Sequence, residues 1–186
     1  MQYSADIGNP IPTTHIAFLR GVTPSGKNAV KMAAVRDVLA QGGFANVRTW
    51  IQSGNIAFST NLSAKQTAAR VRELIHTELG PDLSVIVKTP SELQSVLDGN
   101  PFADDAHAIN RVFFVLANQA PDPHTARELM AQSFGEDKLF ITPKATYLYI
   151  PGSAARSRLN TAFLEKKLGL AMTSRNFNTV SKMIGF

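Results

Sequence analysis

The 186-residue sequence contains no cysteine, and this absence excludes disulfide bonds, zinc–thiolate sites, iron–sulfur clusters and thiol nucleophiles. No apolar run approaches the roughly 18–20 residues that a membrane-spanning helix requires. Residues 1–14 have neither a basic start nor an apolar segment, so they lack the pattern of a secretory signal. These absences lead us to expect a cytoplasmic protein that has no membrane partner.

Acidic residues are scarce in the last part of the sequence. Residues 138–186 hold eight Lys/Arg and one Asp/Glu, a net charge of +7, whereas residues 91–137 carry −6 and residues 1–90 carry +4. A basic segment of this density can attract phosphate groups, although a solvated basic surface explains it equally well. The acidic middle segment argues against a protein that binds nucleic acid over its whole surface.

Charged residues make up only 18% of the sequence and apolar residues 44%, a balance typical of a globular protein. Hydrophobic periodicity and turn residues predict the same order of elements twice: a strand, a helix, a two-stranded hairpin, a helix and a strand. The predicted strands are residues 15–19, 47–51, 56–59, 83–88, 111–117, 138–142, 146–150 and 171–173. The predicted helices are residues 30–41, 63–79, 89–99, 158–168 and 176–184, together with one that begins at Asp122-Pro123.

This order is the split βαβ arrangement, so we predict an α+β protein of two tandem ferredoxin-like (βαββαβ, α/β-plait) domains. The predicted boundaries are a flexible tail over residues 1–14, a first domain over residues 15–90 and a second domain, with linking and closing helices, over residues 91–186. The two halves share almost no sequence identity, so the repeat is one of pattern only. A single mixed sheet shared by both halves is the main alternative.

A glycine-rich loop follows the first predicted strand. Residues 21–27 fit the spacing G-x-x-x-x-G-K, in which backbone N–H groups, a helix start and the Lys27 ammonium bind phosphate. Asn28 stands where a nucleotide-binding loop carries Ser or Thr, so the usual magnesium ligand is absent. The pattern favours a smaller, metal-free anion near Arg20 and Lys27, and a simple glycine turn is the alternative.

The second candidate segment is a strand and the polar turn after it. Alternation places Arg48 and Gln52 on the same strand face as Trp50, where an arginine and an aromatic ring are suited to a planar ligand. Ser53 and Asn55 add neutral hydrogen-bonding groups at the turn. The alternative is that Trp50 belongs to the core, Arg48 pairs with a carboxylate, and the turn residues only close the hairpin.

Two further polar segments precede predicted helices in the second half. Arg156 and Ser157 stand before the helix over residues 158–168, where we expect Ser157 to cap the helix and Arg156 to attract an anion. A capped helix start explains this segment without a ligand. Before the closing helix, capping accounts for only part of a dense polar cluster, which contains Arg175, Asn176 and Asn178.

Catalytic and metal-binding patterns are weak. The four histidines have no shared metal-ligand spacing, and no Gly-x-Ser-x-Gly segment is present. Asp104, Asp105 and His107 lie close enough in sequence to suggest a metal site, but a solvated loop is the favoured interpretation. We therefore predict no metal and no cofactor, and the sequence leaves open whether the protein is an enzyme.

Several of these segments occur together in a known combination. They are Leu19-Arg20-Gly21, Gly26-Lys27-Asn28, Lys31-Met32, Val47-Arg48-Thr49, residues 52–55 and residues 173–180. Through them the sequence resembles the DUF1697 family of uncharacterised bacterial proteins from about residue 15 onward. The resemblance implies a pair of ferredoxin-like domains and supplies no activity. Pro24 departs from the family pattern by removing a backbone N–H from the loop, and Arg158 stands where lysine is expected.

We therefore predict a protein in which both halves contribute to a polar, basic inter-domain site for an anionic ligand that bears phosphate or carboxylate. The alternatives are a nucleic-acid-binding plait with Tyr147 and Tyr149 on an open sheet face, a small-molecule enzyme of unknown reaction, and a purely structural polar cluster. The sequence does not indicate an oligomeric state. The predicted site residues are Arg20, Lys27, Asn28, Arg48, Gln52, Ser53, Asn55, Arg156, Ser157, Arg175, Asn176 and Asn178.

Overall fold

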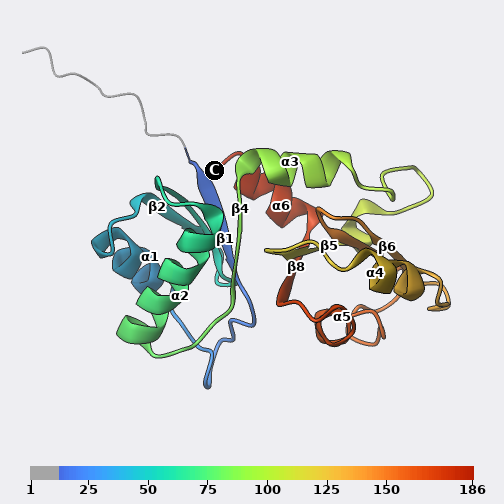
Figure 1. Ribbon diagram of the computed structural model, residues 1–186, viewed down its shortest axis with the longest axis horizontal. Coiled ribbons are helices and arrows are strands. Elements are labelled where there is room, and N and C mark those ends of the chain that lie inside the picture. The colour runs from blue at the N-terminus through green and yellow to red at the C-terminus, as the bar shows by residue number, and fades with distance from the viewer. Residues whose placement is uncertain (1–12) are drawn as a thin grey trace, which may run out of the picture.

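The computed structural model describes residues 13–186, and in this part the chain forms two four-stranded antiparallel sheets and six α-helices (Figure 1). Its fold class is therefore α+β. Most of the predicted tail over residues 1–14 lies outside the described residues. Thr14, at its end, donates its backbone N–H to the carbonyl oxygen of Phe58 at 3.1 Å. None of the helices in residues 13–186 combines the length and hydrophobicity that crossing a membrane requires.

The first half folds around a sheet with the strand order β2-β3-β1-β4. Helices α1 and α2 cover one face of this sheet, and Val35, Phe58 and Val71 are fully buried between them. A capping box at Ser63 and Gln66 begins α2, because each side chain bonds the backbone N–H of the other. The elements are β1 (His15–Leu19), α1 (Met32–Gln41), β2 (Ala45–Trp50), β3 (Asn55–Ser59), α2 (Ala64–Leu79) and β4 (Val85–Lys88).

The second half repeats this arrangement with the strand order β6-β7-β5-β8. Its first core lies between the sheet and two helices, α4 and α5, where Val115 and Leu164 are fully buried. The two sheets share no strand, so the alternative of a single mixed sheet is wrong. The elements are α3 (Pro90–Asp98), a short 3-10 turn (Ile109–Arg111), β5 (Val112–Ala117), α4 (Pro123–Met130), β6 (Lys138–Ile141), β7 (Thr146–Tyr149), α5 (Thr161–Leu168), β8 (Met172–Asn176) and α6 (Phe177–Ile184).

Two predictions about the last third of the chain are wrong. Helix α5 begins at Thr161 rather than at residue 158, because Asn160 and not Ser157 caps it by accepting from the N–H of Phe163 at 3.0 Å. The Ser157 hydroxyl instead donates to Asp137 at 2.6 Å. Strand β8 is longer than predicted, because it pairs with β5 along its whole length, as far as Asn176 opposite Phe113.

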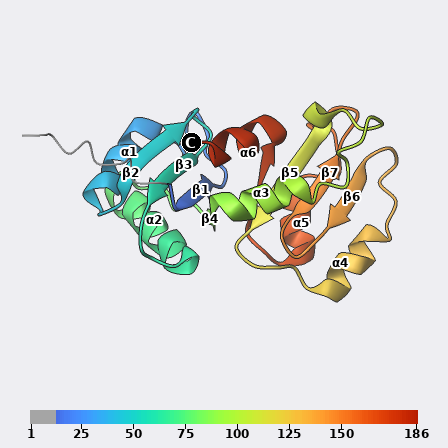
Figure 2. The ribbon, with the colours of Figure 1, turned by 90° about the horizontal axis from the view of Figure 1, so that it is seen from above.

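A second, shared core joins the two halves. Helices α3 and α6 pack against each other between the sheets, as both views of the ribbon show (Figures 1 and 2). They bury the remaining faces of both sheets, including Phe18 on β1 and Phe114 on β5. Tyr147 is only 1% exposed in this core, and its hydroxyl donates to the carbonyl oxygen of Val96 at 3.0 Å. Tyr147 is therefore not available to stack on the bases of a nucleic acid.

Candidate functional site

Arg175 on β8 reaches from the second half into the first. Its Nε donates to Oδ1 of Asn55 at 2.6 Å, and its Nη2 donates to the carbonyl oxygens of Leu19 and Ser53, each at 3.0 Å. These acceptors belong to the end of β1 and to the turn between β2 and β3. One guanidinium thus holds two segments of the first half against β8 of the second.

The other end of the guanidinium is bonded within its own strand. Nη1 donates to the hydroxyl of Thr173 at 2.7 Å and to the carbonyl oxygen of Ser174 at 2.8 Å. Because an arginine side chain has five N–H donors, these contacts and those of Nε and Nη2 across the interface use all of them. Arg175 therefore has no donor left for a ligand.

The positive charge of Arg175 has no carboxylate among its described contacts. Every acceptor is a neutral oxygen, and the guanidinium also lies over the ring of Phe18, 5.1 Å from its centroid. Burial lowers the pKa of Arg175 to about 10, because removing the cation from water disfavours its charged form. The side chain remains charged at neutral pH and makes its surroundings positive.

The turn that receives Arg175 is built around Asn55 and Gly54. Asn55 is fully buried, and its Nδ2 donates to the carbonyl oxygen of Trp50 at 3.1 Å and to the hydroxyl of Ser53 at 2.9 Å. These two bonds orient its Oδ1 toward Arg175. Gly54 has φ +78°, and a Cβ at this position would lie 2.7 Å from the Cβ of Leu19. Only glycine fits between the turn and β1 here.

A second arginine crosses the interface in the opposite direction. Arg20, just after β1, forms a two-pronged ion pair with Glu165 on α5, with Nε 2.5 Å from Oε1 and Nη2 bonded to Oε2. Glu165 also accepts the backbone N–H of Met172 at 2.9 Å. The hydrogen bond with Glu165 raises the pKa of Arg20 and the attraction of the two charges adds to it, while burial opposes both. This pair is neutral overall, unlike Arg175.

Both arginines line an open recess of about 470 Å³ between the two halves, which we call the Arg20 recess. The first turn of α5 forms one wall, and its cap Asn160 takes the N–H of Phe163, which leaves the N–H groups of Thr161 and Ala162 without helical partners. The positive end of α5 and the charge of Arg175 therefore act on one space. The lining residues are Arg20, Gly21, Asn160, Thr161, Ala162, Thr173, Ser174 and Arg175.

Apart from Gly21, the glycine-rich loop lies outside this recess. Asn28 donates to the carbonyl oxygen of Gly21 at 3.3 Å, and Lys27 is exposed. Gln52 accepts the backbone N–H of Met32 at 3.1 Å and so occupies the start of α1, the place where the loop was predicted to hold a phosphate. Gln52 lines a different hollow of about 460 Å³ with Thr23, Pro24, Ala29, Val30 and Lys31.

The predicted pair of Arg48 and Trp50 faces the C-terminal end of the chain. The Arg48 guanidinium lies 4.9 Å from the ring centroid of Phe186, and its Nη2 donates to the hydroxyl of Thr13 at 2.6 Å. Lys182 lies over Trp50, 5.0 Å from the ring centroid. These contacts give Trp50 and Arg48 protein partners on a face that is separate from the Arg20 recess.

The remaining predicted residues also lie apart from the recess. Asn176 accepts the N–H of Thr179 at 2.9 Å and so caps α6. Arg156 and Asn178 are exposed. Of the twelve predicted residues, Arg20 and Arg175 line the recess. Ser53 and Asn55 do not line it, but they accept hydrogen bonds from Arg175.

The recess and the ion pair of Arg20 involve residues that the sequence did not single out. Glu165 is the sole acidic residue after position 138, and this isolation was the signal that it pairs with an arginine. Thr161 and Ala162 carried no signal, because their role depends on where α5 begins. No group of three potential metal-ligating side chains occurs within residues 13–186. His107, the residue of the suspected metal loop, contacts Asp104 at 2.5 Å and Lys138 at 2.8 Å.

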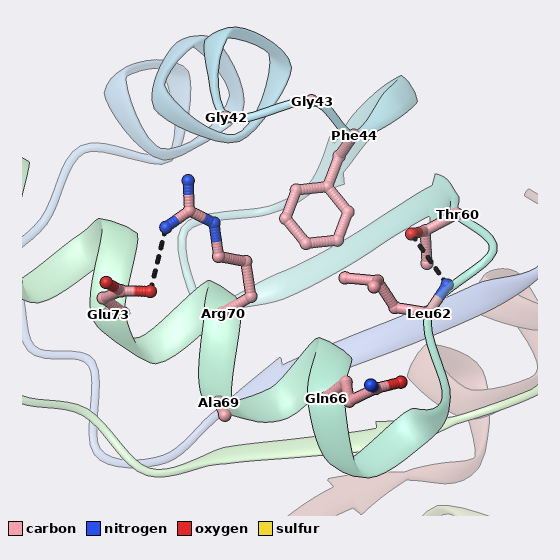
Figure 3. A pocket seen from close by; sticks show the side chains of 9 residues that line it. All are labelled: Gly42, Gly43, Phe44, Thr60, Leu62, Gln66, Ala69, Arg70 and Glu73. Carbon is pink, nitrogen blue, oxygen red and sulfur yellow. Dashed lines mark hydrogen bonds and ion pairs between the residues drawn. The ribbon is translucent and has the colours of Figure 1, made fainter.

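Another hollow, of about 640 Å³, lies in the first half beside α1 and α2 (Figure 3). Phe44 and Leu62 form its apolar walls, and none of the predicted site residues lines it. The one ion pair drawn there joins Arg70 and Glu73 at 2.9 Å, so its charges are already matched. This hollow has room for a molecule but lacks the charged groups that would recognise an anion.

Comparison with known proteins identifies a family and a fold. The model of a family described as "Protein of unknown function (DUF1697)" matches residues 13–147. The solved structure of conserved bacterial protein SP0830 from Streptococcus pneumoniae is similar, with a TM-score of 0.73 and 20% sequence identity over 93% of this chain and 97% of that chain. The comparison with curated proteins gives no significant match. At this identity the structural similarity shows a shared fold.

Proposed function

The chain belongs to the DUF1697 family, whose function is unknown, and we propose a function from the geometry of the chain itself. In this proposal the Arg20 recess binds the phosphate or carboxylate group of a small anionic ligand. We further infer that residues 15–90 and 91–186 are two ferredoxin-like domains. The strand orders β2-β3-β1-β4 and β6-β7-β5-β8, equivalent in the two halves, support this division. The ligand then sits where the two domains meet, a common place for small-molecule sites.

The observation that carries the proposal is the unmatched charge of Arg175. The carboxylate of Glu165 belongs to the same interface, but Arg20 already neutralises its charge with a two-pronged ion pair. A cation that is removed from water and bonded only to neutral oxygens favours an anion nearby. The first turn of α5 also faces the Arg20 recess, and its N–H groups and the positive end of its helix dipole favour an anion there.

Arg175 acts in this proposal as a positioning residue and a fixed source of positive potential. Its five N–H groups are used by the protein, so the ligand is bound by other groups. The N–H groups of Thr161 and Ala162 and the hydroxyl of Ser174 are the donors that line the recess. Arg20 is 38% exposed at its side chain and adds charge at the rim. These groups alone indicate no chemical reaction, so the function that we propose is ligand binding.

The second candidate is that this cluster only joins the two domains. The use of every Arg175 donor by the protein, with Nε and Nη2 bonded across the interface, favours it. The two candidates differ in one respect, because an anion stabilises the fold only if the recess binds it. The nucleic-acid alternative has lost Tyr147 as a stacking surface, and what supports it is the basic charge of residues 138–186.

The test places a carboxylate in the recess by substitution. In wild-type protein we expect inorganic phosphate or adenosine monophosphate, added at constant ionic strength, to raise the melting temperature with saturation. Ala162→Asp should abolish this rise, because the new carboxylate occupies the end of α5. Ala64→Asp is the matched control, since it adds the same charge to the first turn of α2 and should leave the rise unchanged.

Two results would contradict the proposal. One is a wild-type melting temperature that phosphate does not change, which would leave the structural candidate. The other is a rise that persists in Ala162→Asp. A short RNA oligonucleotide is a third arm, and binding that weakens with salt and survives Ala162→Asp would favour the nucleic-acid alternative instead.

A further inference from the structure

A second basic recess lies at the other end of the interface between the halves. Antiparallel pairing places Val85 opposite Leu19 and Lys88 opposite Ile16, so Lys88 and the Arg20 end of β1 are at opposite ends of this strand pair. Along β4, Ile86 belongs to the shared core between the halves. Side chains two apart on a strand share a face, so Lys88 points to the same side as Ile86, toward the second half.

The space beside Lys88, which we call the Lys88 recess, has a volume of about 270 Å³. Both halves build it: β4 and α3 form one wall, and the segment after β5 and the turn between β6 and β7 form the other. Its size is slightly below the roughly 300–1,000 Å³ typical of sites for drug-sized ligands, so it suits a small molecule. The lining residues are Lys88, Glu92, Ser95, Val96, Asn118, Gln119, Ala120, Pro143 and Lys144.

Some of the polar groups in this recess already have partners. Asn118 accepts the N–H of Val87 at 2.9 Å and donates to the carbonyl oxygen of Val85 at 2.8 Å, and so closes the open edge of β4. One carboxylate oxygen of Glu92 accepts the N–H of Thr89 at 2.7 Å in the capping box of α3. These groups shape the recess and are not free to change partner without cost.

The two ammonium groups are different. No hydrogen bond or ion pair to a described residue engages the ammonium of Lys88 or Lys144. Lys88 is partly buried, and burial lowers its pKa, while the charge of Glu92 acts in the opposite direction. A partly buried ammonium that the protein leaves without an acceptor, in a recess with a second ammonium, is suited to an external anion.

We propose that the Lys88 recess binds a small monocarboxylate with a short apolar chain. The carboxylate would accept hydrogen bonds from Lys88 and Lys144, with the amide of Gln119 as a further donor. The apolar chain would lie against Val96 and Pro143. Two cations and one carboxylate leave a single excess positive charge, which matches one carboxylate better than a dianionic phosphate.

The test uses butyrate and its neutral analogue butyramide with the full-length protein. Amide chemical shifts of ¹⁵N-labelled wild-type protein should change with saturation as butyrate replaces chloride at constant ionic strength. These changes should centre on Ser95, Gln119 and Lys144, and butyramide should produce none of them. Lys88→Met should weaken butyrate binding at least about tenfold, because a charge-assisted bond is lost. Lys65→Met, on an exposed position of α2, should leave it unchanged.

The proposal is overturned if butyrate produces no saturable change, if butyramide acts equally, or if Lys88→Met binds butyrate as well as the wild type. Stronger binding of inorganic phosphate than of butyrate at the same residues would also overturn it, since the recess would then prefer a dianion. If Lys88→Met does not fold, Lys144→Met at the more exposed wall applies the same test. Ala162→Asp should bind butyrate normally, which separates this site from the Arg20 recess.

Discussion

Two arginines cross the interface between the halves, and they differ in what they bond. Arg20 is partly exposed and pairs with a carboxylate, Glu165, whereas Arg175 is largely buried and bonds only neutral oxygens. The first contact balances its own charge, and the second leaves a positive charge at the interface. The comparison indicates that Arg175 carries most of the structural contribution and also supplies the potential from which we infer an anion site.

The largest effect is expected from Arg175→Met. This substitution leaves the buried Asn55 Oδ1 and the backbone carbonyl oxygens of Leu19 and Ser53 without their donor, so the free energy of unfolding should fall by roughly 3–5 kcal/mol. Urea denaturation measures the difference. Arg156→Met, at an exposed position, is the control and should change stability by less than about 0.5 kcal/mol. A loss below about 1 kcal/mol for Arg175→Met would show that its bonds contribute little.

The turn that receives Arg175 provides the next test. Gly54→Ala should lower the free energy of unfolding by about 1–3 kcal/mol, because the new Cβ meets Leu19 and the backbone keeps a positive φ. Gly26→Ala separates the two causes, since Gly26 also has a positive φ, +86°, but nothing lies within 4 Å of the added Cβ. Equal losses for the two variants would mean that backbone strain alone acts and that the turn does not need close contact with β1.

The ion pair of Arg20 and Glu165 should contribute less than Arg175 to the free energy of unfolding. A double-mutant cycle with Arg20→Met and Glu165→Gln should give a coupling of about 0.5–1 kcal/mol, because solvent screens a pair in which the Arg20 side chain is 38% exposed. The coupling should decrease when the salt concentration rises. A coupling as large as the loss in Arg175→Met would reverse the proposed order of the two arginines.

The smallest effect is expected from Lys88→Met. Burial lowers the pKa of Lys88 from its ordinary 10.5, so the unfolded state binds more protons than the folded state between the two pKa values. Wild-type stability should therefore rise with pH across that window, and Lys88→Met should lack this part of the rise. At about pH 7 the variant should be at least as stable as the wild type. Lys65→Met, at an exposed site, should keep the wild-type pH dependence.

Local patterns were sufficient to predict most of the elements. The spacing of apolar residues predicts α2, and the capping box at Thr89 predicts α3, each to within one residue of its observed start. Helix α5 departs furthest from its predicted start, because Ser157 and Asn160 are both good caps and the serine hydroxyl instead bonds a distant residue, Asp137. Such a choice depends on tertiary contacts that a local pattern does not contain.

The candidate site was harder to predict than the fold. Arg20 and Arg175 line one recess because the end of β1 meets β8 at the interface, which follows from topology and not from sequence spacing. Lys27 and Arg48 have the same chemistry but lie elsewhere, since the long loop before α1 carries one away and the register of β2 directs the other to Phe186. Residue type indicated the chemistry of a site, and only the fold decided which residues share it.

Helices α3 and α6, which lie between the sheets, also bear on how the molecule comes apart. Each half completes its interior with side chains of α6, the last helix in the chain order, so the first sheet keeps an uncovered apolar face until the final segment has docked. Assembly must bring together positions more than 100 residues apart, such as Asn55 and Arg175, which slows folding. Denaturation should accordingly proceed as one cooperative transition, with the two halves melting together rather than in turn.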